Sequence, residues 1–131
     1  MDALLDAVNF RIKMGGEDVA VAIAQDHGSG EILMAAFMNR AALEKTIETG
    51  LMHYYSTSRQ RLWKKGEESG HVQRVREVFI DCDGDALVFK VDQKGAACHT
   101  GHYTCFYRRL KGDGWQVVGR KVFNPEDVYR G

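Results

Sequence analysis

Residues 81–85 read Asp-Cys-Asp-Gly-Asp, and residues 98–105 read Cys-His-Thr-Gly-His-Tyr-Thr-Cys. This stretch holds all three cysteines of the chain, Cys82, Cys98 and Cys105. Fifteen and six residues separate them, so no pair has the Cys-x-x-Cys spacing of a zinc knuckle or a redox dithiol. Three thiolates can fill three corners of a tetrahedral zinc site and leave the fourth to water, as in a catalytic site. The alternative is that each cysteine is a small buried apolar side chain.

Carboxylates alternate through the first of these motifs. They offer hard oxygen ligands that suit magnesium or calcium, whereas sulfur favours zinc. An EF-hand is excluded, because Ala86 stands where that loop needs glycine and Asp92 where it needs glutamate. The alternative is a solvated turn, since an Asp-Gly pair favours a hairpin. Two ligand sets of opposite character suggest a two-metal hydrolase, and its hard ligands are Asp81, Asp83 and Asp85.

The segments on either side of the acidic motif have the composition of strands. We expect strands over residues 72–82 and 85–91 that meet at residues 83–84. A two-residue hairpin would place Cys82 and Asp85 on one side of the sheet. A single bulged strand would instead place the three aspartates on one face and Cys82 on the other. The sequence leaves both arrangements open.

The rest of the chain predicts an α+β domain built mostly of antiparallel hairpins with one or two helices. Apolar residues up to Ile12 predict a short N-terminal helix that ends at Gly15-Gly16, and two strands follow around a turn at residues 25–30. Asn39 and Gly50 are suited to the N-cap and C-terminal stop of a second helix. We expect a strand over residues 51–56 and a last hairpin over residues 103–110 and 115–123, with Cys105 early in its first strand. Residues 1–131 are expected to form one domain.

A basic, glycine-containing loop is expected over residues 58–71. From residue 59 to residue 76 there are six Arg or Lys residues against two acidic ones. Ser58, Ser69 and backbone N–H groups can hold phosphate oxygens, arginine suits bidentate phosphate contacts, and Gly70 lets the backbone approach a ligand. The alternative is a solvated basic loop.

Composition limits the classes of partner and compartment. Lys+Arg and Asp+Glu both number 18, so the neutral chain has no overall field that would attract nucleic acid or a membrane. No apolar run approaches a membrane span, and the first ten residues do not form a signal peptide. An odd number of cysteines fits a reducing cytoplasm.

Together these motifs resemble the phosphoribosyl-AMP cyclohydrolase family, which opens an adenine ring in histidine biosynthesis. The matches run in unbroken order over about residues 19–109. They include Ala24-Gln25-Asp26, Leu33-Met34, Tyr55-Ser56, Leu62-Trp63, Lys65-Gly66-Glu67, Ser69-Gly70-His71, Gln73, residues 81–85, Gln93 and Cys98-His99-Thr100-Gly101 with Cys105-Phe106.

The resemblance implies metal sites, a catalytic histidine and an intertwined homodimer. Zinc would be held by Cys82 of one subunit with Cys98 and Cys105 of the other, and magnesium by Asp81, Asp83 and Asp85. Zinc-bound hydroxide would attack C6 of 1-(5-phosphoribosyl)-AMP and break the N1–C6 bond, with His99 as proton shuttle. We expect this phosphorylated nucleotide to be bound by Ser58, Arg59, Trp63, Lys65, Ser69, Gly70 and His71.

Two positions depart from the family pattern. Arginine is frequent in the family at the positions where this chain has Thr57 and His102, and these departures bear on the phosphate contacts rather than on the metal ligands. The alternative function is a non-catalytic binding module whose zinc only staples a small dimer.

Overall fold

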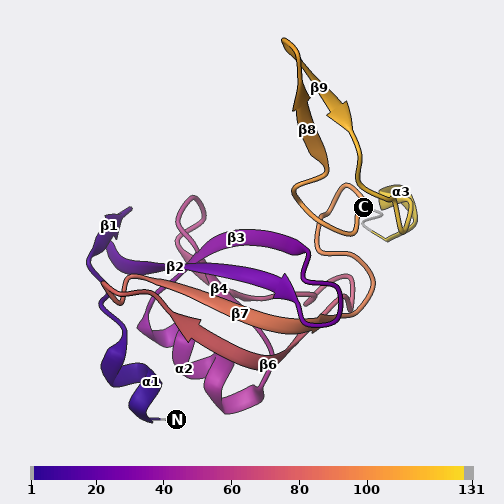
Figure 1. Ribbon diagram of the computed structural model, residues 1–131. Coiled ribbons are helices and arrows are strands. Elements are labelled where there is room, and N and C mark those ends of the chain that lie inside the picture. Colours follow the sequence, from indigo (N-terminus) through magenta and orange to yellow (C-terminus); the bar gives the residue numbers. More distant parts are fainter. Residues whose placement is uncertain (1, 129–131) are drawn as a thin grey trace.

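The computed structural model describes residues 2–128 as one small domain of strands with a few short helices (Figure 1). One large sheet has the strand order β5-β4-β3-β2-β7-β6, and β1 pairs with β2 beside it. All its pairings are antiparallel except that of β2 with β7. The α+β prediction is therefore confirmed. The elements are α1 (Asp2–Ala7), β1 (Ile12–Met14), β2 (Glu17–Asp26), β3 (Ile32–Met38), α2 (Arg40–Thr49), β4 (His53–Ser56), β5 (Arg61–Lys64), β6 (Gln73–Ile80), β7 (Ala86–Gln93), β8 (Arg108–Lys111), β9 (Gly114–Val117) and α3 (Pro125–Val128).

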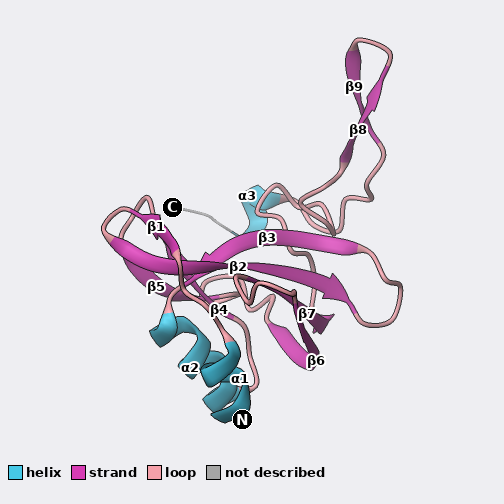
Figure 2. Cartoon of the chain, turned by 60° about the vertical axis from the view of Figure 1, so that its left-hand side comes forward, coloured by secondary structure: helices cyan, strands magenta, loops and turns pink. Residues whose placement is uncertain are grey.

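The sheet has one covered face and one open face. Along β2 the side chains of Ala20, Ala22 and Ala24 are fully buried, whereas Val21 and Ile23 between them are only half-buried. Side chains of a strand alternate between the two faces, so the alanines face the core. Helices α1 and α2 lie on that side of the sheet, as Figure 2 shows. The core is completed by β3, β7 and α2, with Leu33, Met38, Leu43, Leu87 and Phe89 almost fully buried.

Helix α2 begins and ends at the residues that its sequence predicts. The Asn39 side chain accepts a hydrogen bond from the backbone N–H of Ala42 (2.9 Å), which satisfies one of the free donors of the first turn. Gly50 has a φ of 73°, and its N–H donates to the Thr46 carbonyl. A left-handed residue at this position is favourable for glycine because it has no Cβ.

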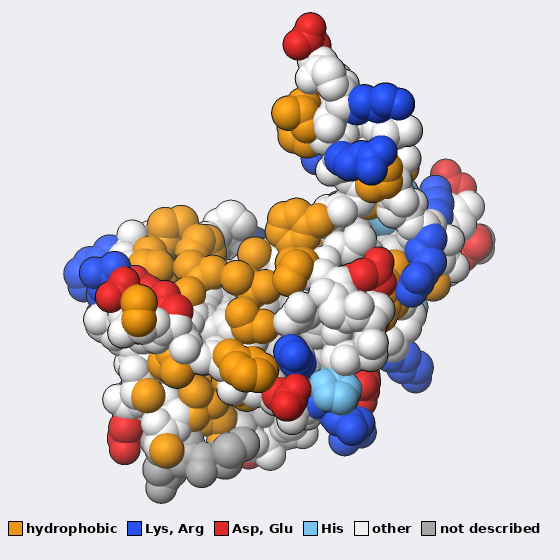
Figure 3. Space-filling model, viewed as in Figure 1, with side chains coloured by type: hydrophobic (Ala, Val, Ile, Leu, Met, Phe, Trp, Pro, Cys, Tyr) orange, Lys and Arg blue, Asp and Glu red, His pale blue; other side chains and the backbone are white. Residues whose placement is uncertain are grey.

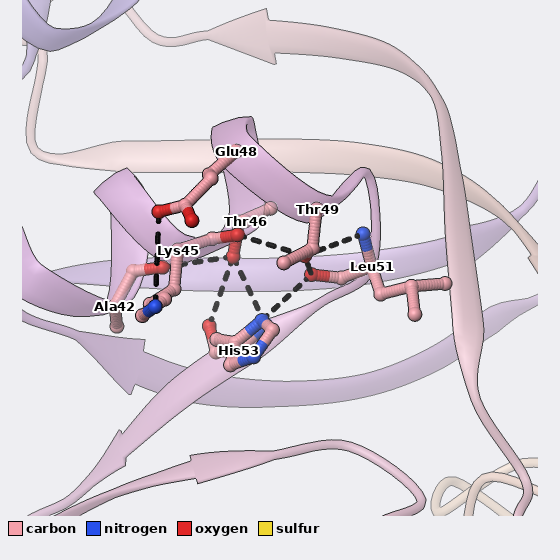
Figure 4. Close-up of polar contacts among 7 residues, drawn as sticks. All are labelled: Ala42, Lys45, Thr46, Glu48, Thr49, Leu51 and His53. Carbon is pink, nitrogen blue, oxygen red and sulfur yellow. Dashed lines mark hydrogen bonds and ion pairs between the residues drawn. The ribbon is translucent and has the colours of Figure 1, made fainter.

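The link from α2 to β4 is held by buried polar contacts (Figure 4). The Thr46 hydroxyl donates to the Ala42 carbonyl and accepts the backbone N–H of His53, each over 2.9 Å. The His53 ring contacts the Leu51 carbonyl through Nδ1 at 2.9 Å. His53 therefore supports the fold at this corner.

Three local predictions were wrong. The N-terminal helix ends at Ala7, and Ile12 lies in β1, because Gly15 and Gly16, with φ of 58° and 81°, form the turn of the β1–β2 hairpin. The basic loop contains strand β5, since Trp63 packs on the buried Tyr54 ring at 5.1 Å between centroids. The last hairpin is limited to β8 and β9, and Cys105 precedes it in an irregular segment.

No helix within residues 2–128 combines the length and the apolar character that crossing a membrane requires.

Candidate active site

The acidic motif forms a hairpin turn at one end of the sheet. The Asp81 N–H donates to the Ala86 carbonyl (3.0 Å), so the hairpin and not the bulged strand is present. Gly84 has a φ of 75°, and a Cβ there would lie 2.8 Å from the Ala7 carbonyl oxygen. Only glycine fits this close approach between the turn and the end of α1. The turn brings oxygen atoms of Asp81, Asp83 and Asp85 within 4.8 Å of one another.

This cluster has the donor chemistry of a divalent-cation site. Three carboxylates this close repel one another, and a bound cation relieves that repulsion. Part of the relief comes from Arg11, whose Nε donates to Asp85 Oδ2 at 2.6 Å. The hydrogen bond from Arg11 lowers the pKa of Asp85. Nothing in the sequence indicated a role for Arg11, because it is 74 residues away from Asp85 in the chain. The two side chains meet only in the folded protein, where Arg11 directly precedes β1 and β1 pairs with β2.

Two of the three cysteines lie together at the opposite end of the sheet. Burial raises the pKa of the Cys105 thiol to about 12, and the neighbouring Cys98 thiol adds to the shift. The Thr100 hydroxyl donates to Cys98 Sγ at 3.0 Å. The backbone holds the pair in place, because the Cys98 N–H donates to the His102 carbonyl (3.2 Å) and the Cys105 N–H to Leu33 of β3 (2.7 Å). The pair offers two soft ligands at one point.

Cys82 does not join that pair within one chain. It is exposed in the acidic turn, before β7, whereas Cys98 follows the end of β7. The eight residues of β7 span about 26 Å at the usual rise per residue. Among residues 2–128, the aspartate cluster is the one group of three or more potential ligands whose atoms converge. A site with all three sulfurs therefore needs a second chain.

A cavity of about 790 Å³ opens beside the cysteine pair. Its walls come from β3, β4, β5 and the loops at residues 57–59 and 65–69, with Cys105 and the exposed His99 at the same cavity. Five of the seven residues predicted to contact substrate line it: Ser58, Arg59, Trp63, Lys65 and Ser69. The structure thus brings the basic loop and the cysteine motif to one place.

Gly70 and His71, the other two predicted substrate residues, are not among the residues that line this cavity. The His71 ring lies under the loop that carries Cys98: a Cβ on Gly95 would come within 2.5 Å of it. It also meets the Phe123 ring edge-on at 4.9 Å. Within one chain His71 therefore packs against the segment that leads to Cys98 and supports it.

Lys65 lies in the cavity wall and interacts electrostatically with both cysteines of the pair. Its amine donates to the Ala97 carbonyl and lies 5.7 Å from the centre of the Trp63 ring. Burial lowers the pKa of Lys65, and the adjacent Cys105 and Cys98 oppose that shift by favouring the charged amine. A cation at this point favours thiolate over thiol in the pair.

A chain of hydrogen-bonded polar side chains runs from Tyr54 in β4 to the loop that follows β7. The Tyr54 hydroxyl donates to Gln73 Oε1 (2.6 Å), and Gln73 Nε2 donates to Gln93 Oε1 (2.8 Å). Gln93 in turn donates to the carbonyls of His71 (3.2 Å) and Lys94 (2.8 Å). Sequence reasoning gave these residues no role, because their contact depends on the pairing of β4, β6 and β7.

The fold and the site define a small α+β domain with a cavity whose wall includes His99 and Cys105 of the thiol pair. The family model of phosphoribosyl-AMP cyclohydrolase matches residues 34–107. The chain belongs to the phosphoribosyl-AMP cyclohydrolase family and is a hydrolase.

Curated relatives match nearly the full length. The phosphoribosyl-AMP cyclohydrolase of Methanothermobacter thermautotrophicus is 59% identical over 93% of this chain and 90% of its own. That of Methanococcoides burtonii is 62% identical over 90% of this chain and 95% of its own. That of Alkalilimnicola ehrlichii is 53% identical over 95% of this chain and 88% of its own. The resemblance seen in the sequence motifs is thereby confirmed.

Proposed function

We propose that this chain hydrolyses the N1–C6 bond of the adenine ring of 1-(5-phosphoribosyl)-AMP, a step of histidine biosynthesis. One observation carries the proposal: a single cavity of about 790 Å³ is lined by Ser58, Arg59 and Lys65 and reaches both His99 and Cys105. Pockets for ligands of drug size have about 300–1,000 Å³, so a nucleotide of this kind is a suitable occupant. The names of the relatives supply the reaction class.

The donor sets fit two metals of different character. Cys98 and Cys105 are soft ligands beside the Lys65 cation, and we propose that Cys82 of a second subunit completes their zinc site. Asp81, Asp83 and Asp85 offer only oxygens, and we propose that they hold magnesium. When bound, zinc supplies a Lewis acid that makes water a nucleophile at neutral pH. The carboxylate turn and the thiol pair lie at opposite ends of one sheet, so both subunits of a homodimer would contribute to each active site.

The remaining chemistry falls to the side chains of the cavity. His99 follows Cys98 directly and lines the cavity, so its imidazole can accept the proton of the attacking water and return it to N1 as the bond breaks. Trp63 lines the cavity while Tyr54 packs against its ring, which holds a flat surface for the base. Arg59 and Lys65 supply positive charge for phosphate, whereas Arg61 is engaged by Glu67 at 3.0 Å. We place the enzyme in the cytoplasm, where its three free thiols are stable.

The proposal is tested by incubating the pure, metal-loaded protein with 1-(5-phosphoribosyl)-AMP and following the absorbance change on ring opening. Turnover that is lost in Cys98→Ser, together with zinc, is the expected result. A wild-type protein that retains its zinc fully but does not turn over the substrate would support the non-catalytic binding module, in which zinc only staples the dimer. Turnover by a protein freed of zinc would remove the metal from the proposal.

Sharing of the site between subunits has its own test. Neither the Cys82→Ala nor the Cys98→Ala homodimer should be active. In a mixed dimer, one site combines both substitutions and the other has neither, so half of the sites should regain zinc and activity. A mixture that stays as inactive as its components would contradict a shared site.

A further inference from the structure

The turn between Cys98 and His102 brings three polar side chains into one row. Two backbone hydrogen bonds close the turn: the Cys98 N–H donates to the His102 carbonyl (3.2 Å), and the Gly101 N–H donates to the Cys98 carbonyl (3.0 Å). The Thr100 hydroxyl lies between the other two side chains, 3.0 Å from Cys98 Sγ and 2.9 Å from His102 Nδ1. Cys98 is buried, whereas Thr100 and His102 are half-buried. One end of this row is therefore a sulfur of the proposed zinc site.

The protons of this row have one consistent order. A threonine hydroxyl has a single proton, and the Thr100 hydroxyl donates it to Cys98 Sγ. The contact between Thr100 Oγ1 and His102 Nδ1 then needs a proton on the ring nitrogen, so His102 donates and Thr100 accepts. The same order suits a metal-bound cysteine, because a thiolate is the form that binds a metal and it has no proton of its own to donate.

The His102 ring is held in place for this contact. It stacks on the Tyr107 ring, with centroids 3.8 Å apart and an angle of 5° between the planes. Tyr107 is itself fixed, because its carbonyl accepts the N–H groups of Val118 (2.8 Å) and Gly119 (3.2 Å). A Cβ on Gly119 would lie 2.5 Å from the Tyr107 Cβ, so the two segments are in close contact. A ring already fixed by stacking loses little further freedom when it donates to Thr100.

A second segment supports the turn through its backbone. The Tyr103 N–H donates to the Arg120 carbonyl (3.0 Å), and His102 pairs with Lys121 in a single β-bridge. Figure 3 shows Lys and Arg side chains gathered around the base of the β8–β9 hairpin, at this end of the molecule. The backbone beside the row is therefore fixed, in surroundings that suit a negatively charged sulfur.

A hydrogen bond to a ligating sulfur has two effects. It orients the sulfur, since the Cys98 side chain must keep Sγ within reach of the Thr100 hydroxyl. It also withdraws electron density from the sulfur, because the donated proton attracts the charge of the thiolate. Three thiolates around a zinc ion leave a net negative charge, which makes the ion a weaker Lewis acid than one held by neutral ligands. A donor to one of these sulfurs opposes that weakening.

We infer that Thr100 and His102 are positioning residues for the reaction, because they hold Cys98 Sγ in its metal-binding orientation and draw negative charge from it. We call these two side chains the donor pair. Neither is among the residues that line the cavity, so the donor pair acts through Cys98 and not on the nucleotide. The inference rests on the zinc site proposed above and adds the side chains that orient and tune one of its ligands. It assigns His102 to the metal site, whereas the sequence suggested the phosphate contacts.

The test compares variants of the full-length chain that remove or restore each donor. Thr100→Val keeps the shape of the side chain without its hydroxyl, and Thr100→Ser restores the hydroxyl. His102→Leu removes the ring donor, and His102→Asn restores an N–H near the position of Nδ1. In competition with a chelator, zinc affinity should fall about tenfold or more in Thr100→Val and about threefold or more in His102→Leu. Thr100→Ser and His102→Asn should stay within about twofold of wild type.

The matched control is Thr49→Val. It removes a hydroxyl that donates to the Lys45 carbonyl (2.8 Å) in α2, so zinc affinity should change by less than about twofold. Far-ultraviolet circular dichroism of every variant shows that the fold is retained. His102→Leu leaves the Thr100 hydroxyl in place, and it supplies the comparison if Thr100→Val does not fold.

A second readout reports on the sulfur itself. Zinc is replaced by cobalt(II), whose thiolate complexes absorb in the near ultraviolet by charge transfer from sulfur to the metal. A hydrogen bond lowers the energy of the sulfur electrons, so its loss in Thr100→Val should move this band to longer wavelength, and Thr100→Ser should return it. His102→Leu should move the band in the same direction by a smaller amount. A substitution that only loosens the turn would weaken binding without this ordered shift.

The outcomes separate this inference from the proposed function. If wild type binds cobalt through sulfur, and Thr100→Val and His102→Leu keep the wild-type zinc affinity and an unmoved band, the donor pair is overturned and the zinc site stands. A wild type that shows no sulfur-to-cobalt band would overturn both. If the variants respond as expected in a protein that does not hydrolyse 1-(5-phosphoribosyl)-AMP, the donor pair stands and the proposed function falls.

Discussion

Replacement of Gln73 by leucine tests whether the hydrogen-bonded chain from Tyr54 through Gln73 to Gln93 stabilises the fold. Gln73 is fully buried and makes two side-chain hydrogen bonds, of 2.6 Å from the Tyr54 hydroxyl and 2.8 Å to Gln93 Oε1. Leucine has a similar volume, so the main change is the loss of these bonds. Burial raises the pKa of Tyr54, so its hydroxyl remains a protonated donor at every working pH.

The loss in free energy of unfolding follows from the polar groups that Gln73→Leu leaves without a hydrogen-bond partner. An unpaired buried polar group costs about 1–3 kcal/mol, which applies in full to the Tyr54 hydroxyl. Gln93 is only half-buried, so water can replace part of its lost contact and its share is about 1 kcal/mol. We expect Gln73→Leu to lower the free energy of unfolding by about 2–4 kcal/mol. Adding Tyr54→Phe removes the orphaned hydroxyl, so the double variant should regain about 1 kcal/mol.

Urea unfolding at one fixed protomer concentration and fixed zinc measures these differences, because the stability of a dimer depends on concentration. The four proteins of the cycle are wild type, Gln73→Leu, Tyr54→Phe and the double variant. A cost below about 0.5 kcal/mol for Gln73→Leu, or single effects that simply add, would refute the reasoning, since separate sites add within that margin.

Three further predictions concern the site and its supports. His99→Ala should keep its metals, as measured by atomic absorption, and its turnover should fall by about two to four orders of magnitude. A normal turnover rate would show that His99 has no acid–base role. Gly95→Ala should destabilise the protein by about 2–4 kcal/mol, because φ is 67° and the new Cβ would meet the His71 ring at 2.5 Å. The control Gly112→Ala, where φ is 61° and the Cβ would meet open space, should lower the free energy of unfolding by only about 1 kcal/mol in the same urea unfolding experiment. In metal-free protein, the lowered pKa of Asp85 gives stability that is full above the ordinary carboxyl pKa and is lost as pH falls through the lower one. Arg11→Met should remove that part of the acid dependence in denaturation curves from pH 6 downward, and an unchanged curve would show that the ion pair contributes nothing.

Local signals were sufficient for some parts of this protein. The caps of α2 at Asn39 and Gly50 depend on contacts within a few residues, so the sequence predicted both ends of the helix. The hairpin at residues 81–85 was one of two arrangements that the sequence allowed, and the approach of Gly84 to α1 accompanies the one that formed. β5 was missed, because its pairing with β4 depends on the Tyr54–Trp63 contact rather than on an apolar alternation of its own.

The sequence by itself determined the order of the cysteines, aspartates and basic residues, the α+β class and the family, because these depend on residue chemistry and order along the chain. Only the tertiary structure decided which of these groups meet. It placed Cys98, Cys105 and five of the predicted substrate residues around the same region, and it brought Arg11 to Asp85 across 74 residues. It also separated Cys82 from the other cysteines by the length of β7. Strand pairing sets these distances, and it depends on side chains far apart in sequence that must share one core.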